Sequence, residues 1–141
     1  MLNLIKKLNN EITDIIFVGG VSEMIQGIRE TTKDIDICVL NVDELKSRYI
    51  LKEWQDTSVF SKSGKRAGIE SEDYIIDIFI EDTLPDFIEI DGVKCETLNS
   101  LIDRYKLVIE GLDDNKDFHS KEKMIKKLNN LLNKIKDATI N

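Results

Sequence analysis

The chain has 141 residues, which is the length of about one globular domain. Its 27 acidic side chains outnumber its 20 basic ones, and the net charge of −7 excludes a general attraction to nucleic acid, so any polyphosphate must bind at a focused site. Two cysteines, Cys38 and Cys95, are too few for a metal cluster, and we expect reduced core thiols. No stretch approaches the roughly 18 apolar residues of a membrane span, and no apolar leader is evident. We therefore expect a soluble cytoplasmic protein without a membrane partner.

An apolar pattern at helical spacing opens the chain. Apolar residues within positions 2–12 recur every three or four residues, which predicts a helix. A short β-prone run, residues 14–18, follows it and ends at Gly19 and Gly20. Ser22 is placed to begin a short helix directly after the glycines.

A strand and then a longer helix are expected next. Residues 34–40 are typical of a buried strand, and residues 41–54 predict a helix. Asn41 is placed to cap that helix, with Glu44 completing a capping box.

Two hairpins and two helices complete the predicted elements. Strands over residues 57–62 and 67–71 flank a hairpin signal, and residues 73–81 form the most strongly β-branched run in the chain. Residues 87–96 predict a second hairpin, whose turn is Asp91-Gly92. Two C-terminal helices are then expected over residues 97–112 and 118–137. The second of them carries an apolar seam of Ile125, Leu128, Leu132 and Ile135.

These elements predict an α/β chain of the α+β type. We expect a small mixed sheet, a helix that follows the Gly-Gly turn, and a C-terminal helical pair. The predicted organisation is a single domain over residues 1–141, with a core over residues 15–96 and the helical pair over residues 97–137.

Asp34 and Asp36 stand together at the start of the strand expected over residues 34–40. Residues two apart on a strand point to the same face, so the two carboxylates project side by side. Their repulsion costs free energy unless a cation neutralises it. Mg²⁺ prefers oxygen ligands and commonly combines carboxylates with water and substrate phosphates. The pair therefore predicts a divalent-metal site.

Asp77 is a candidate third ligand. It lies inside the apolar run 73–81, where a charge is costly without a partner. On a strand adjacent to that of Asp34 and Asp36 it would complete a cluster of three carboxylates. The alternative is an edge strand that holds the carboxylate in water.

The glycine pair is a candidate phosphate site. A Gly-Gly turn between a strand and a helix lets backbone N–H groups approach a phosphate closely, and the start of the helix adds to the attraction. Ser22 either caps this helix or donates its hydroxyl to a phosphate. Arg29 is either a phosphate clamp or a surface ion pair. The alternative for the glycines is an ordinary turn.

The segments "VGGVSEMIQGIRETTKDIDICVL" and "DYIIDIFI" resemble the nucleotidyltransferase superfamily, whose fold is that of DNA polymerase beta. The shared pattern is Gly-Gly or Gly-Ser, a short helix, D-x-D on the next strand and a third Asp on a later strand. "GIRETTKDID" most resembles small toxin-type or uncharacterised members with the motif G-x-R-x-T-x-D-I-D. The resemblance covers roughly residues 15 to 80. Val21 departs from it, because many members have Ser or Thr after the glycines.

The resemblance implies a nucleotidyltransferase that moves a nucleoside monophosphate from an NTP, such as ATP, to an acceptor hydroxyl and releases pyrophosphate. It implies two Mg²⁺ ions, with Mn²⁺ as an alternative metal. The implied metal-binding and catalytic residues are Asp34, Asp36 and Asp77. The implied nucleotide-binding residues are Gly19, Gly20, Ser22, Arg29 and Lys106, the last of them contacting the phosphates.

Other functions stay open at this level. The acceptor could be RNA, a protein or a small molecule. The chain could instead be a non-catalytic nucleotide-binding or metal-binding module that acts with a protein partner, as in a toxin-antitoxin pair. Within the enzymes, an antibiotic nucleotidyltransferase is the alternative, since an acidic protein suits a cationic drug. A basic spot of Lys62, Lys65 and Arg66 either meets substrate or is simply solvated.

Overall fold

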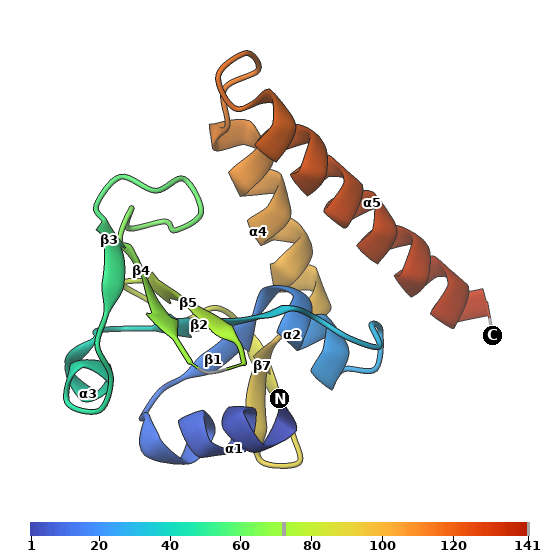
Figure 1. Cartoon of the computed structure of the whole chain (residues 1–141). Coiled ribbons are helices and arrows are strands. Elements are labelled where there is room, and N and C mark those ends of the chain that lie inside the picture. Colours follow the sequence, from blue (N-terminus) through green and yellow to red (C-terminus); the bar gives the residue numbers. More distant parts are fainter. Residues whose placement is uncertain (72, 141) are drawn as a thin grey trace. The chain divides into compact units, whose positions relative to one another are not determined.

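The computed structural model describes residues 1–71 and 73–140, without the side chains of residues 139 and 140. The chain forms two compact units, Met1–Thr97 and Leu98–Asn141, and each is described by itself. Within the described residues the chain is a mixed α/β protein with one seven-stranded mixed sheet and five helices (Figure 1). None of the described helices is long and apolar enough to cross a membrane.

The N-terminal unit contains the whole sheet and three short helices, as far as the structure describes it. Its elements are, in chain order, α1 (Leu2–Glu11), β1 (Ile16–Val18), α2 (Gly19–Ile25), β2 (Asp34–Val39), α3 (Asp43–Lys46), β3 (Lys52–Gln55), β4 (Arg66–Glu70), β5 (Ile75–Ile80), β6 (Phe87–Ile90) and β7 (Val93–Glu96). The strand order is β3-β4-β5-β2-β1-β7-β6. The pairs β2 with β5 and β1 with β7 are parallel, and the other neighbours are antiparallel.

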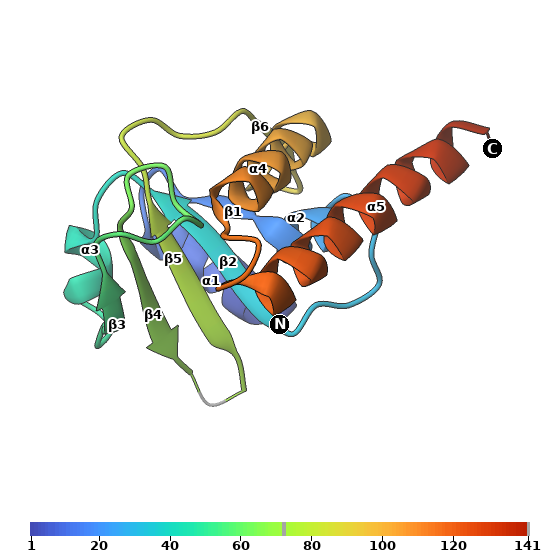
Figure 2. The ribbon, with the colours of Figure 1, turned by 90° about the horizontal axis from the view of Figure 1, so that it is seen from above.

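The main core lies on one face of this sheet. Alternate residues of β2 and β5 point to that face because side chains alternate along a strand. Ile35 and Ile37 of β2 are fully buried there, together with Ile5 of α1, Val21 of α2 and Leu45 of α3. Figure 2 shows β4, β5 and β2 side by side, with α1 behind them. The three helices therefore leave the opposite face of the sheet for other groups.

A smaller apolar cluster lies on that opposite face. It contains Ile16 and Val18 of β1, Cys38 of β2 and Phe79 of β5, with Phe60 packed against it. Cys38 and Cys95 are both buried thiols outside any disulfide, as expected from the sequence. Because Cys38 and Phe79 alternate with the core residues of their strands, this is also the face on which the candidate carboxylates lie.

The segment after β2 differs from the expected helix over residues 41–54. α3 ends at Lys46, and β3 begins at Lys52 and pairs with β4. The hydroxyl of Ser47 donates to the backbone carbonyl of Glu44 (2.7 Å), a local bond that competes with helix continuation. Only Leu45 is buried in α3, so little apolar surface rewards a longer helix.

The expected capping box is also absent from this segment. Asn41 does accept a hydrogen bond from the backbone N–H of Asp43 (3.2 Å). Glu44, however, accepts from the backbone N–H of Thr13 (3.1 Å), so its carboxylate ties α3 to the turn after α1. This contact joins residues far apart in the chain, and local spacing gave no sign of it.

Residues 57–62 were expected as a strand, and this is wrong. They lie in the connection between β3 and β4, where the hydroxyls of Ser61 and Ser63 donate to the backbone carbonyl of Ile80. Serine side chains that bond to the main chain favour turns over strand ladders. The second hairpin is confirmed, since β6 and β7 pair around Asp91-Gly92, both of which have positive φ.

The C-terminal unit is a pair of helices. α4 (Leu98–Gly111) and α5 (Phe118–Ile140) pack on each other and run in opposite directions (Figure 1). Met124 and Leu131 of α5 are buried, whereas Ile125 and Leu132 are each 41% exposed. The expected seam is therefore wrong at Ile125 and Leu132, because the buried residue is in each case the preceding one, Met124 or Leu131.

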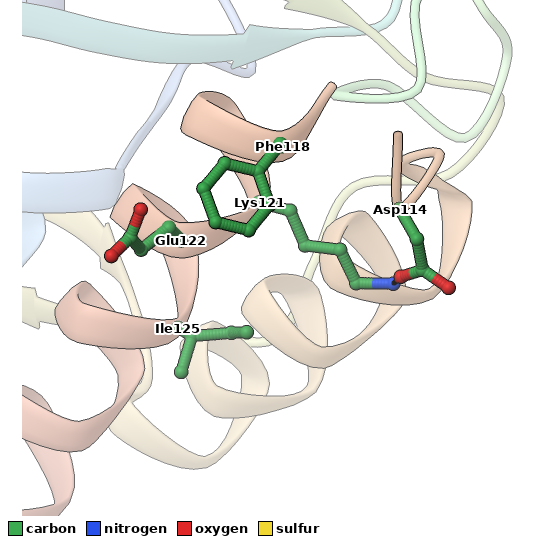
Figure 3. A pocket seen from close by; sticks show the side chains of 5 residues that line it. All are labelled: Asp114, Phe118, Lys121, Glu122 and Ile125. Atoms are coloured by element: carbon green, nitrogen blue, oxygen red, sulfur yellow. Dashed lines mark hydrogen bonds and ion pairs between the residues drawn. The ribbon is translucent and has the colours of Figure 1, made fainter. Parts of the chain in front are cut away.

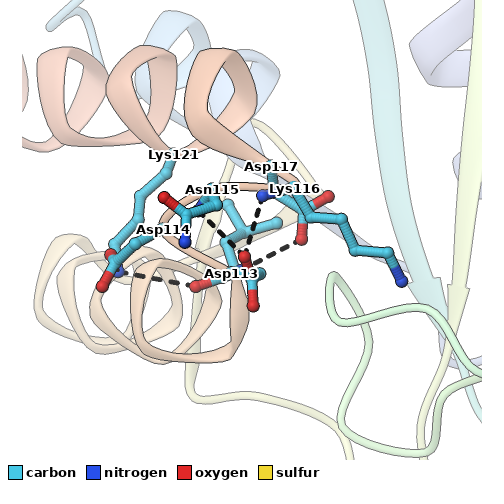
Figure 4. Close-up of polar contacts among 7 residues, drawn as sticks. Asp113, Asp114, Asn115, Lys116, Asp117 and Lys121 are labelled. Carbon is cyan, nitrogen blue, oxygen red and sulfur yellow. Dashed lines mark hydrogen bonds and ion pairs between the residues drawn. The ribbon is translucent and has the colours of Figure 1, made fainter.

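The loop between α4 and α5 is organised by carboxylates (Figure 4). One carboxylate oxygen of Asp113 accepts the backbone N–H groups of Asn115 and Lys116, both at 2.8 Å. The backbone N–H of Asp113 donates in turn to the carboxylate of Asp117 (3.0 Å), the residue before α5. These bonds provide partners for backbone N–H groups of the connection that lie outside both helices.

Candidate functional site

The three candidate carboxylates lie on two neighbouring strands in the middle of the sheet. Asp36 of β2 is the direct register partner of Asp77 of β5, and Asp34 is paired with Ile75. Directly opposed residues of paired strands project to the same face, so Asp34, Asp36 and Asp77 share one face. We call it the carboxylate face. Since β5 lies between β4 and β2, the edge-strand alternative for Asp77 is wrong.

Gly19 lies against Asp36. Val18, the last residue of β1, is the register partner of Asp36, and the chain turns into α2 directly after it. Gly19 has φ +61, and a Cβ atom at this position would overlap Oδ2 of Asp36. Both the backbone conformation and the approach of the carboxylate therefore require glycine.

Gly20 lies close to the guanidinium of Arg29 and the hydroxyl of Thr32. A Cβ atom here would lie 2.8 Å from Nη1 of Arg29 and 2.8 Å from Oγ1 of Thr32. Arg29 follows α2 in a loop, where its Nε donates to the carbonyl of Thr31 (2.7 Å) and its Nη1 lies 4.0 Å from the carboxylate of Glu23. Sequence reasoning missed Thr32, although the hydroxyl lies only two residues before the first carboxylate.

The sequence suggested that Ser22 begins the helix after the glycines, and this is wrong. α2 begins at Gly19, and Ser22 lies fully buried inside it. Its hydroxyl donates to the backbone carbonyl of Glu96 (2.6 Å) and accepts from Nε2 of Gln26 (2.9 Å). The single hydroxyl hydrogen is thus committed to β7, and we leave Ser22 out of the candidate phosphate contacts. Val21 points into the main core.

Arg66 also lies on the carboxylate face, although sequence reasoning did not place it there. Its Nη2 lies 3.4 Å from Oδ1 of Asp77, with both side chains about one quarter exposed (24% and 23%). The guanidinium carbon lies 4.8 Å from the ring centroid of Phe60 and 5.3 Å from that of Phe79. The basic spot suggested by the sequence grouped Arg66 with loop lysines, whereas it belongs to β4. The alternation of Arg66 and Gly68 along a strand was the available signal.

The carboxylate face can be tested for its fit to a divalent metal. Among the described residues, no group of three or more His, Cys, Asp or Glu side chains is arranged to hold a metal ion. The donor type and the backbone register nevertheless suit one, because adjacent strands bring paired residues to about 5 Å. The Asp77 carboxylate is turned toward Arg66.

Lys106 belongs to the other unit. It is an exposed residue of α4, and the structure describes that unit by itself. Its contact with nucleotide phosphates therefore stays a prediction from the resemblance.

Two hollows are lined by residues outside β2, β4 and β5. One, of about 330 Å³, is in the C-terminal unit and is lined by Asp114, Phe118, Lys121, Glu122 and Ile125 (Figure 3). The ammonium of Lys121 is paired there with the carboxylate of Asp114. The other, of about 350 Å³, is in the N-terminal unit and includes Asn9, Thr13 and Glu89 in its lining. Neither contains a residue predicted for the site.

No protein-family model matches the chain, and a search of curated proteins finds no match to it.

Proposed function

We propose that the chain is a Mg²⁺-dependent nucleotidyltransferase with a fold like that of DNA polymerase beta. It would transfer a nucleoside monophosphate from an NTP to an acceptor hydroxyl and release pyrophosphate. The observation that carries the proposal is the direct register of Asp36 with Asp77, on neighbouring parallel strands beside the Gly19 turn. Two carboxylates opposed in the middle of a sheet cost free energy, and a cation-binding role explains their placement.

Asp34, Asp36 and Asp77 would hold the metal. Bound Mg²⁺ would lower the pKa of the acceptor hydroxyl and neutralise charge on the triphosphate. Asp77 would in addition accept the proton of the acceptor hydroxyl, because a carboxylate within reach of that group can act as a general base.

The Gly-Gly turn would bind the phosphates. The first backbone N–H groups of a helix have no partner within that helix, and Gly20 lets a ligand approach them closely. Arg29 and Thr32 bring a guanidinium and a hydroxyl to the same turn. The ion pair of Arg29 with Glu23 is long, at 4.0 Å, and the Arg29 side chain is 35% exposed, so the guanidinium is accessible to a phosphate.

Transfer of label tests the proposal. The full chain is incubated with Mg²⁺ and each α-labelled NTP, against tRNA, protein extract and aminoglycosides. We expect labelled acceptor from the parent and a loss of about a hundredfold or more in Asp36→Asn and Asp77→Asn. Asp137→Asn, on α5, controls for the loss of one negative charge. Undiminished transfer by both carboxylate variants would contradict the proposal.

A second candidate is a non-catalytic module that binds nucleotide. The ion pair between Arg66 and Asp77 favours it, because this pair gives Asp77 a structural role without any metal. If the chain is such a module, the parent and Asp77→Asn would bind Mg²⁺-ATP equally well, and neither would label any of the acceptors. Calorimetric titration of both proteins with Mg²⁺ and a non-hydrolysable ATP analogue separates the two candidates.

A further inference from the structure

The position of Arg66 follows from the register of β4 with β5. Gly68 is the direct partner of Asp77, and Arg66 lies two residues before Gly68 on the same strand. Residues two apart share a face, so Arg66 projects on the carboxylate face and reaches Asp77 diagonally.

Gly68 leaves room for this contact. Its φ lies outside the left-handed region, and a Cβ atom there would meet only the carbonyl oxygens of Ile76 at 3.6 Å and Lys52 at 3.9 Å. Neither the backbone conformation nor crowding therefore demands glycine at this position. What glycine provides is the absence of a side chain directly opposite Asp77, and the guanidinium of Arg66 approaches Asp77 on that side.

Phe60 and Phe79 stabilise the guanidinium independently of Asp77. Both ring centroids lie within the distance at which a cation is attracted to an aromatic ring, 4.8 Å and 5.3 Å from the guanidinium carbon. Arg66 can thus leave the carboxylate without losing all of its contacts. The carboxylate is also accessible, because its side chain is 23% exposed.

We propose that Arg66 is a displaceable counter-cation of Asp77, which holds the carboxylate until a divalent cation takes its place. This inference rests on the metal site of the proposed function. Arg66 and the metal compete for one carboxylate, so the apparent affinity for metal is reduced by the fraction of molecules in which Asp77 is paired. Arg66 is here a positioning residue, because it acts on the metal only through Asp77.

Mn²⁺ binding to the full chain without nucleotide tests the competition. Free Mn²⁺ is followed by its electron paramagnetic resonance signal for the parent, Arg66→Gln and Arg66→Lys. We expect Arg66→Gln to bind Mn²⁺ about threefold to tenfold more tightly than the parent. The reason is that the substitution removes the positive charge that competes with Mn²⁺ for the partly exposed carboxylate of Asp77. Arg66→Lys keeps the charge and should stay near the parent value. Arg66→Met, which retains the aliphatic length, replaces Arg66→Gln if circular dichroism shows that the latter is unfolded.

Asp36→Asn and Asp77→Asn separate this inference from the proposed function. If both bind Mn²⁺ like the parent, the metal site itself is wrong and both proposals fall. If both lose binding while Arg66→Gln and Arg66→Met bind no more tightly than the parent, the metal site stands and the role given to Arg66 is overturned. Binding by Arg66→Gln alone, with none by the parent, would show that the metal cannot displace Arg66, so the metal site would stand and the displaceable role of Arg66 would be overturned. If neither binds, both proposals are overturned.

Discussion

Gly19 and Gly20 are neighbours in the chain, but an added side chain would meet a different obstacle at each. At Gly19 it would meet the carboxylate of Asp36 and a left-handed backbone, whereas at Gly20 it would meet the far end of the Arg29 side chain and the hydroxyl of Thr32. Gly19 is therefore the position at which stability and site geometry are coupled, and Gly20 is the position at which a substitution acts chiefly on the site.

Gly19→Ala tests that coupling, with Gly92→Ala as its matched control. Gly92 also has positive φ, +80, but a Cβ atom there meets nothing within 4 Å. We expect Gly92→Ala to lower the free energy of unfolding by about 1 kcal/mol through backbone strain alone. Gly19→Ala should cost at least about 2 kcal/mol, because Asp36 must also move. Urea denaturation measures both, and equal losses would show that the carboxylate does not crowd Gly19.

Ser22 gives a second prediction at this scale. Ser22→Ala removes a buried hydroxyl that bonds to Glu96 and Gln26, and we expect a loss of about 1 to 2 kcal/mol in the free energy of unfolding. Ser47→Ala, which removes an exposed hydroxyl bonded to Glu44, should cost less than about 0.5 kcal/mol. Binding of Mg²⁺-ATP at a temperature where both variants are folded should match the parent. A selective loss of binding in Ser22→Ala would return Ser22 to the phosphate contacts.

Among the elements, the loop between α4 and α5 contains a carboxylate, that of Asp113, which accepts two backbone N–H groups. The backbone N–H groups of Lys116 and Asn115 lower the pKa of Asp113 below its ordinary value of 3.8. A carboxylate whose pKa is lower in the folded chain stabilises the fold above its unfolded pKa, and this contribution is lost as the pH falls through the folded pKa. The α4 and α5 pair should therefore be weakened by acid at this loop.

Asp113→Asn checks this dependence. We expect the parent to melt at a higher temperature than Asp113→Asn at neutral pH, and the difference to shrink as the pH falls below about 4. Asp137→Asn controls for the loss of one charge from the same unit. Melting temperatures between pH 7 and about pH 2.5 measure the effect. A difference that is constant over this range would mean that the charge of Asp113 does not stabilise the loop.

Charge is unevenly divided over the whole molecule. Residues 98–141 contain slightly more basic than acidic side chains, so the acidic excess of the chain lies in residues 1–97. The carboxylate face belongs to this same unit. An NTP is itself strongly anionic, and the field of this unit opposes its approach. We therefore expect nucleotide binding at the proposed site to depend on a divalent cation.

Replacing Mg²⁺ by EDTA tests that dependence. We expect the affinity for a non-hydrolysable ATP analogue to fall at least about tenfold in EDTA, because unscreened carboxylates then face the phosphates. NaCl at matched ionic strength should restore little of it, since salt screens charge without coordinating oxygen. Full restoration by NaCl would mean that Mg²⁺ acts by screening alone, and the proposed metal site would be wrong.

Spacing along the chain was sufficient for the features that depend on near neighbours. The alternation that places Asp34 and Asp36 on one face, the strand around Asp77, the turn at Asp91-Gly92 and the helix after Thr97 all follow from local periodicity and local backbone preferences. The same reasoning overextended the helix after Asn41, because pairing of β3 with β4 outweighs local propensity there.

Contacts between distant residues settled the rest. Only the parallel pairing of β2 with β5 brings Asp36 opposite Asp77, and only the register of β4 brings Arg66 to that carboxylate. The Ser22 hydroxyl likewise bonds to a carbonyl 74 positions away. Strand order and register depend on which apolar faces can be buried together, a property of the folded chain that no short window of sequence contains.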